Sequence, residues 1–210
     1  MTDAGVGATR PLLTITVPTI PGRESLLSRC LWSITEQAST RVHVLVVQGT
    51  AKLGDKANLA ALHTQAEYMT VVDDDDYLDG AYLESVLPHL QVGVDFVGLK
   101  VLQWIDERFY GVGTTRGDLS RFMQGQDHGP TPKGITRTEL WRKVPMGNDY
   151  KADRRWCAEV FPLITSHAFV DRAIYVYDHR PATSAFLGGG HRDIGQWPYD
   201  ANKVEWLTLD

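Results

Sequence analysis

Four consecutive aspartates, Asp73 to Asp76, form the densest cluster of chemically useful side chains in the sequence. They follow the apolar run Tyr68 to Val72, which predicts a short buried strand with the acids at its carboxyl end. Because neighbouring carboxylates repel one another, such a cluster needs a cation to balance its charge. The aspartates therefore predict a divalent metal site, against two simpler interpretations: a solvated acidic loop, or a cap of the helix after Leu78.

The segments around this cluster alternate between the two periodic patterns of secondary structure. Apolar, β-branched runs predict strands, and apolar residues at helical spacing predict helices. Open α/β sheets bind ligands at the carboxyl ends of their strands, where the aspartates are expected. The predicted strands span residues 12–17, 42–47, 68–72 and 95–104, with a hairpin near 105–112, and the predicted helices span residues 24–37, 54–66, 82–90, 136–144 and 150–159.

Composition predicts one soluble domain of enzyme size. The chain has 210 residues, 43% of them hydrophobic, and a formal charge of -5, which argues against a generally basic nucleic-acid binder. Cys30 and Cys157 are expected to be reduced core thiols. The N-terminus lacks an apolar signal core, and no run approaches the roughly 20 residues that span a bilayer. A cytoplasmic location is the resulting expectation.

Several motifs occur in an order that resembles the GT-A glycosyltransferases, particularly those of family 2. The resemblance covers about residues 12–186 and is strongest at the aspartates, which resemble the family's Asp-x-Asp motif. The motifs are Val17-Pro18-Thr19 with Arg23, Gly54-Asp55-Lys56-Ala57-Asn58, Val72 to Leu78, and Trp141-Arg142-Lys143-Val144 with Gly147-Asn148-Asp149-Tyr150.

The resemblance implies an α/β fold of the GT-A type, a Rossmann-like nucleotide-diphospho-sugar transferase fold with a mostly parallel central sheet flanked by helices. Residues 1–10 would be a flexible N-terminus and residues 11–186 the GT-A domain. Its nucleotide-binding part would span about 11–104 and its acceptor part about 105–186. Residues 187–210 would form a C-terminal tail or lid.

The implied reaction is transfer of a sugar from a nucleotide-diphosphate donor to an acceptor hydroxyl, with Mn²⁺ or Mg²⁺ bridging the aspartates and the donor phosphates. Such hard cations favour oxygen ligands. In this assignment Asp75 is the main metal ligand, Asp73 contacts the ribose or base, and Asp74 belongs to the donor site. His179 would complete the metal shell, with His191 as a weaker alternative.

The donor site would draw on three further segments. Arg23 could pair with a phosphate through its planar fork, and the start of the helix near Lys56 suits a diphosphate. Gln48 stands where similar enzymes often carry an acid that reads the base, which leaves the donor base open. The residues assigned to the donor in these segments are Pro18, Thr19, Arg23, Gln48, Lys56 and Asn58.

Asp149 is the candidate general base, because direct displacement at a sugar needs a carboxylate near the acceptor hydroxyl. Similar enzymes commonly have Glu-Asp at this point, whereas this chain has Asn148-Asp149. The simpler interpretation is that Asp149 caps the following helix, and Asp153 is the alternative base. Inversion at the anomeric carbon is the expected outcome.

A basic stretch surrounds the candidate base. Between Lys133 and Arg155 there are seven basic residues and three acids. This stretch could guide a DNA acceptor, with Trp141 and Trp156 as stacking platforms, and glycosylation of a hydroxylated base would be one such reaction. The preferred interpretation is a solvated helix face with buried tryptophans. A small molecule or a glycan is an equally admissible acceptor, and the sequence does not specify an oligomeric state.

Two rival functions belong to other classes. A nucleotidyltransferase would share the strand-end aspartates, but it usually adds a Gly-rich phosphate loop, and residues 18–23 contain too little glycine. A nucleotide or nucleic-acid binding module with a degenerate site would bind nucleotide without transfer. Asn148 favours that module, whereas Asp149 argues against it.

Overall fold

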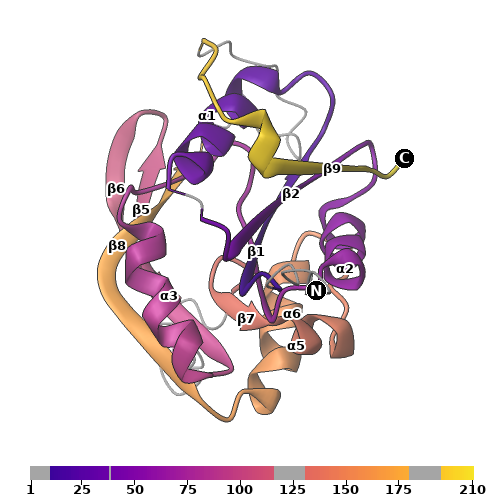
Figure 1. The fold of residues 1–210 in the computed structure, drawn as a ribbon, viewed down its shortest axis with the longest axis vertical. Helices are drawn as coiled ribbons and strands as arrows, with labels where there is room; N and C mark the ends of the chain where they lie inside the picture. The colour runs from indigo at the N-terminus through magenta and orange to yellow at the C-terminus, as the bar shows by residue number, and fades with distance from the viewer. Residues whose placement is uncertain (1–9, 38, 116–130, 180–194) are drawn as a thin grey trace, which may run out of the picture.

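The computed structural model describes residues 10–37, 39–115, 131–179 and 195–210. These residues form a nine-stranded sheet with the order β4-β8-β5-β7-β3-β1-β2-β9, and β6 pairs with β5 outside this path (Figure 1). The strands are β1 (Leu13–Thr19), β2 (Val42–Gln48), β3 (Tyr68–Val71), β4 (Tyr77–Leu78), β5 (Phe96–Ile105), β6 (Arg108–Thr115), β7 (Ile135–Arg137), β8 (His167–His179) and β9 (Val204–Thr208).

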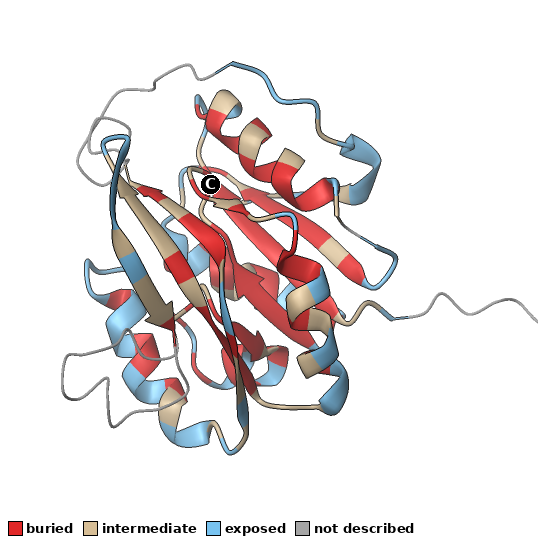
Figure 2. Cartoon of the chain, turned by 90° about the vertical axis from the view of Figure 1, so that its left-hand side faces the viewer, coloured by how far each residue is buried: buried red, intermediate tan, exposed pale blue. Residues whose placement is uncertain are grey.

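Helices cover both faces of this sheet. Alternate residues of β2 show the arrangement: Val44 and Val46 belong to the core cluster with α1 and α3, whereas Leu45 and Val47 belong to the cluster with α2, α5 and α6. Figure 2 shows the buried residues concentrated in the strands between the helical layers. The helices are α1 (Glu24–Thr35), α2 (Leu53–His63), α3 (Tyr82–Val92), α5 (Thr138–Lys143) and α6 (Ala152–Val160), with short 3-10 turns η1 (Phe161–Leu163) and η4 (Ala201–Lys203).

The α/β class and the flanking helices are confirmed, but the sheet is mixed. β9, β2, β1 and β3 run parallel, and β8 runs parallel to β5. The short strand β7 lies between β3 and β5 and is antiparallel to both. The parallel half brings the carboxyl ends of β1, β2 and β3 to one edge, and this edge positions the site.

Three short strands, β4, β7 and β9, were not predicted from the sequence. β9 lies within the segment expected to be a tail or lid, and its residues pair with β2 from Val44 to Gln48. The segment before β9 packs on α1, where Trp197 lies 4.9 Å from Trp32 between ring centroids. Residues 1–9 and 187–194, where the flexible terminus and the lid were expected, lie outside the described residues.

Two further expectations can be compared with the structure. Cys30 and Cys157 are free and buried, as predicted, and burial raises the pKa of both thiols. Within the described ranges, no helix combines the length and apolar character needed to cross a membrane.

Asp95, immediately before β5, connects β5 to the segment that precedes β8. Its carboxylate accepts hydrogen bonds from the backbone amides of Thr165 and Ser166 at 2.8 and 3.0 Å, and from the Thr165 hydroxyl at 2.6 Å. Burial raises the pKa of Asp95, but these hydrogen bonds outweigh burial and lower the pKa to about 2. The ionised form is therefore stabilised by folding.

We predict that Asp95→Asn lowers the free energy of unfolding at pH 7 by about 1–3 kcal/mol. The depressed pKa means that this contribution is complete above the ordinary value of 3.8 and is lost as the pH falls toward 2. Urea unfolding of both proteins from pH 7 to pH 2.5 measures the difference, with the exposed Glu159→Gln as control. A difference that stays constant over this range would contradict the assignment.

Candidate functional site

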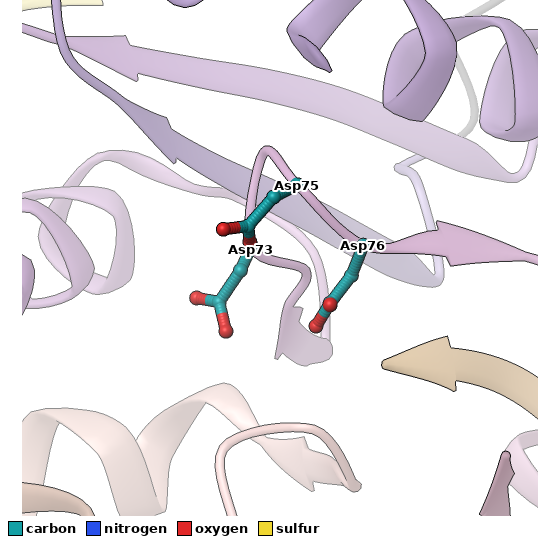
Figure 3. A group of neighbouring side chains, drawn as sticks. All are labelled: Asp73, Asp75 and Asp76. Atoms are coloured by element: carbon teal, nitrogen blue, oxygen red, sulfur yellow. The ribbon is translucent and has the colours of Figure 1, made fainter. Parts of the chain in front are cut away.

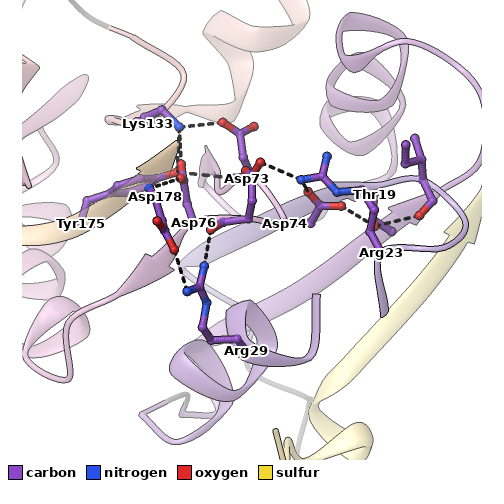
Figure 4. A network of polar contacts seen from close by, with 11 residues as sticks. Thr19, Arg23, Arg29, Asp73, Asp74, Asp76, Lys133, Tyr175 and Asp178 are labelled. Carbon is purple, nitrogen blue, oxygen red and sulfur yellow. Dashed lines mark hydrogen bonds and ion pairs between the residues drawn. The ribbon is translucent and has the colours of Figure 1, made fainter. Parts of the chain in front are cut away.

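The aspartates lie where three parallel strands end. Thr19 and Gln48, the last residues of β1 and β2, are paired in register, and the amide of Val72 continues the ladder beyond β3 by bonding the carbonyl of Thr16. The amide of Asp76 then bonds the carbonyl of Asp73 at 3.0 Å, which closes a turn. The four aspartates thus follow the carboxyl end of β3, and Figure 4 shows the contacts of Asp73, Asp74 and Asp76.

This turn separates the four aspartates into two pairs. Asp74 and Asp76 are 4% and 0% exposed, whereas the side chains of Asp73 and Asp75 are 33% and 20% exposed. The two buried acids are expected to have full sets of protein partners. The two accessible acids, separated by one residue, are the ones that an incoming ligand can reach.

Asp74 connects the aspartates to the loop after β1. The hydroxyl of Thr19 donates to its carboxylate at 2.6 Å, and the guanidinium of Arg23 lies 3.1 Å away. Burial raises the pKa of Asp74 to about 7, although Arg23 opposes this shift. Arg23 also pairs with Asp75 at 2.6 Å. Three predicted donor-site residues, Thr19, Arg23 and Asp74, therefore lie together.

The carboxylate of Asp76 has three partners. Lys133 and the Tyr175 hydroxyl each donate to its Oδ2 at 2.6 Å, and the backbone amide of Asp178 donates to its Oδ1 at 3.0 Å. Burial raises the pKa of Asp76 to about 7, although Lys133 opposes this shift. Asp76 is therefore a structural acid.

Lys133 and Arg29 extend this network to further residues. Lys133 also binds Asp73 at 2.6 Å, so it bridges an accessible and a buried carboxylate. Arg29, from α1, pairs with Asp178 at 2.7 Å and donates to the backbone carbonyl of Asp75 at 2.5 Å. The turn is consequently held from three directions, by the β1 loop, by α1 and by Lys133.

The carboxylates suit a hard divalent cation. One oxygen from each of Asp73, Asp75 and Asp76 lies within 4.8 Å of the other two (Figure 3). Carboxylate oxygens are the ligands that Mg²⁺ and Mn²⁺ favour, and the carboxylates of Asp73 and Asp75 are partly accessible to such an ion.

His179 lies close to this network in sequence but is not one of the three clustered aspartates that could hold a metal ion. Its ring stacks on Tyr177 with 5.7 Å between centroids and 2° between planes. Its role as a metal ligand stays a prediction, and His191, the alternative, lies outside the described residues.

Lys56 and Asn58 have backbone partners that were not expected. Lys56 is 2% exposed, and its ammonium donates to the carbonyls of Thr19 and Gly49 at 2.6 and 2.7 Å, which ties the ends of β1 and β2 together. Asn58 pairs with both the amide and the carbonyl of Met146 at 2.8 and 2.9 Å. Both residues shape the site in this structure, and their contact with a diphosphate stays a prediction.

The loop that carries Asp149 docks on the start of α2. Asn148 stands at the position where similar enzymes have an acid. Its side-chain oxygen accepts from the backbone amide of Asp55 at 3.2 Å, and its side-chain nitrogen donates to the Asp55 carboxylate at 2.8 Å. Gly54 permits this approach, because a Cβ there would lie 2.1 Å from the carbonyl oxygen of Gly147. The replacement of the expected acid by Asn148 thus supplies a docking contact.

Asp149 itself is 48% exposed and organises the start of α6. Its carboxylate accepts from the amide of Lys151 at 3.0 Å and pairs with Arg155 at 2.7 Å. The Lys151 hydrogen bond, followed by the Arg155 charge, lowers the pKa of Asp149. Asp149 therefore forms a turn before α6 but is not its N-cap, which is Lys151, so the expected cap is wrong. Its carboxylate lies at the surface of the loop.

The tryptophans cannot act as stacking platforms for an acceptor. Trp141 and Trp156 are each 1% exposed and stack on one another with 4.2 Å between centroids, in the core beneath α2. Apolar burial outweighs surface display for such large rings. The preferred interpretation of buried tryptophans is confirmed, and the expected base-stacking surface on these residues is wrong.

The sequence interpretation missed several partners of the aspartates. Lys133 was counted only within the basic stretch, and Arg29, Tyr175 and Asp178 were given no role at the aspartates. The run Tyr175-Val176-Tyr177-Asp178 carried a usable signal, because an acid and tyrosines at the end of a strand indicate a polar edge.

Comparison with solved structures shows the fold of GT-A glycosyltransferases. The crystal structure of S. aureus TarS matches with a TM-score of 0.64 and 16% identity, covering 81% of this chain and 37% of that one. TarS 1-349 in complex with UDP matches with a TM-score of 0.67, 17% identity and coverage of 81% and 61%. For the complex with UDP-GlcNAc the values are 0.66, 17%, 80% and 59%.

This chain therefore spans between about a third and two thirds of the length of these TarS chains. No family model matches the sequence, and no curated protein matches it.

We predict that Asn58→Leu releases the loop that carries Asp149. The change removes both hydrogen bonds to Met146, so the free energy of unfolding should fall by about 1–3 kcal/mol. Tryptic cleavage at Lys151 should accelerate relative to the exposed control Asn202→Leu. Unchanged cleavage with unchanged stability would contradict the docking role of Asn58.

Proposed function

We propose that this chain is a metal-dependent, inverting glycosyltransferase that moves a sugar from a nucleotide-diphosphate donor to an acceptor hydroxyl. The observation that carries this proposal is the pair Asp73 and Asp75, accessible and clustered at the carboxyl edge of a sheet of the GT-A type. The sequence features resemble family 2 of these enzymes. We place donor binding in residues 11–104 and acceptor binding in residues 105–186.

A uridine diphosphate sugar is the proposed donor. Two of the similar TarS structures are complexes with UDP and UDP-GlcNAc, which supports this choice of nucleotide. Gln48 ends β2 beside Thr19, and its side-chain amide offers both a donor and an acceptor to a base. Pro18 and Thr19, at the end of β1, would line the nucleoside site.

Asp75 would hold Mn²⁺ or Mg²⁺, as the sequence suggested, and we now propose Asp73 as a second ligand in place of its expected contact with the ribose or base, because the two carboxylates are clustered and accessible. One oxygen from each would leave other coordination positions for phosphate and water. When bound, the metal supplies positive charge that stabilises the leaving diphosphate. Asp76 would hold the turn rather than the metal, because Lys133, Tyr175 and the Asp178 amide already occupy its oxygens. Arg23 would exchange part of its pairing with Asp75 for a phosphate oxygen.

Asp149 is the proposed base. The acceptor oxygen forms a bond to the anomeric carbon while the bond from that carbon to the donor phosphate oxygen breaks, and the acceptor proton passes to Asp149. A lowered pKa keeps Asp149 ionised at neutral pH, so it can receive this proton. Displacement from the face opposite the leaving group inverts the anomeric centre.

Asp75→Ala should weaken the binding of UDP in the presence of Mn²⁺ at least tenfold, because the ion loses one of its two accessible carboxylates. Calorimetric titration with UDP, with and without Mn²⁺, measures this change. The control is Asp106→Asn, in the exposed turn between β5 and β6. Equal metal-supported affinity in Asp75→Ala would overturn the assignment of this ligand.

Asp149→Asn should keep UDP affinity and lose at least 100-fold in turnover, because an amide cannot accept the acceptor proton. Release of UDP from UDP-sugars in the presence of candidate acceptors measures turnover. Full turnover in Asp149→Asn would transfer the role to another group, with Asp153→Asn as the next variant. UDP binding without transfer to any acceptor would favour the nucleotide-binding module instead.

A further inference from the structure

We propose that Lys133 is an internal counter-ion of the metal site, which holds the aspartate turn when no divalent ion is bound and weakens the binding of that ion. This inference rests on the proposed function, because it concerns the metal that the enzyme would use. It assigns Lys133 as a positioning residue that sets the metal concentration at which the site fills.

The geometry of Lys133 supports this role. Its ammonium has three donor hydrogens and three acceptors, the carboxylates of Asp73 and Asp76 at 2.6 Å and the hydroxyl of Tyr175 at 2.9 Å. The rings of Tyr175 and Tyr177 flank the same ammonium at 4.7 and 5.0 Å from their centroids. The charge is therefore held in place by a complete set of partners.

Lys133 shares one ligand, Asp73, with the proposed metal. Its other carboxylate partner, Asp76, belongs to the same cluster of three aspartates, so a divalent ion at Asp73 and Asp75 would lie close to the Lys133 ammonium. Two cations near one carboxylate repel each other, and the repulsion is substantial where water is partly excluded. The Lys133 side chain is only 22% exposed, which limits screening by solvent.

Lys133 also differs from the other cations of the network. Among the described residues, it is the only cation in direct contact with Asp76, whose side chain is 0% exposed. A buried carboxylate without a cation is costly, so Asp76 needs Lys133, a proton or a metal. Removing Lys133 should therefore make the turn depend on a divalent ion for its stability.

The test compares wild type with Lys133→Met and Lys133→Gln at pH 8, and with the control Lys100→Met, which removes an ammonium paired with Asp171. Mn²⁺ affinity is measured without nucleotide by the loss of free-ion electron paramagnetic resonance signal. Thermal melting is followed with chelator and with Mn²⁺. UDP affinity of the wild type with Mn²⁺ is measured in parallel.

At least one Lys133 variant should bind Mn²⁺ at least tenfold more tightly than wild type, and should melt several degrees lower in chelator with most of the loss restored by Mn²⁺. Lys100→Met should match wild type in metal affinity. Unchanged or weaker Mn²⁺ affinity in both Lys133 variants would overturn the inference. So would unfolding that Mn²⁺ does not rescue, because the ion would then be unable to replace the ammonium.

These outcomes separate the two proposals. If wild type binds UDP only with Mn²⁺ while both Lys133 variants show unchanged metal affinity, the counter-ion role is wrong and the proposed function stands. If wild type shows no metal-supported UDP binding although a Lys133 variant binds Mn²⁺ tightly, the counter-ion role stands and the proposed function fails.

Discussion

Compensation of crowded negative charge is the constraint on which this structure depends. Four adjacent carboxylates can occupy one turn only because Arg23, Arg29 and Lys133 reach it from separate parts of the chain. Asp74 and Asp76 are almost completely buried, and burial raises the pKa of each to about 7. The protein thus supplies positive charge that holds the turn, while the carboxylates of Asp73 and Asp75 remain partly accessible to a divalent ion.

The order of the strands determines where this turn lies. The parallel order of β2, β1 and β3 sets three carboxyl ends side by side, so the loops after them share one edge. Lys56 joins two of these loops, and Asn58 and Asn148 dock the Asp149 loop on the helix that starts at the same edge. Positioning is therefore achieved by polar contacts, of which the Lys56 contacts with backbone carbonyls are buried and the Asn148 contact with Asp55 is exposed.

The sequence predicted much of this arrangement because the responsible signals are local. The β1, α1, β2, α2 and β3 pattern and the strand-end position of Asp73 could be inferred from periodicity and order. The pairing of Lys133 with Asp76 could not, because 57 residues separate them and no periodicity connects the two. The short strand β7 gave too few residues for a pattern, and β9 contains strand-favouring residues but lies in a terminal segment that was expected to be a tail, so its pairing with β2 was not foreseen. Trp141 and Trp156 were ambiguous because the same residue type serves in cores and at stacking surfaces.

The central claim is that Asp73 and Asp75 coordinate a divalent ion, and that this ion binds the donor diphosphate. A crystal structure with Mn²⁺ and UDP tests it most directly, through the anomalous signal of the metal. The account predicts one strong peak about 2.0–2.3 Å from oxygens of Asp73 and Asp75 and from the UDP phosphates. UDP bound with no manganese at these carboxylates, or manganese bound there with UDP elsewhere, would contradict it.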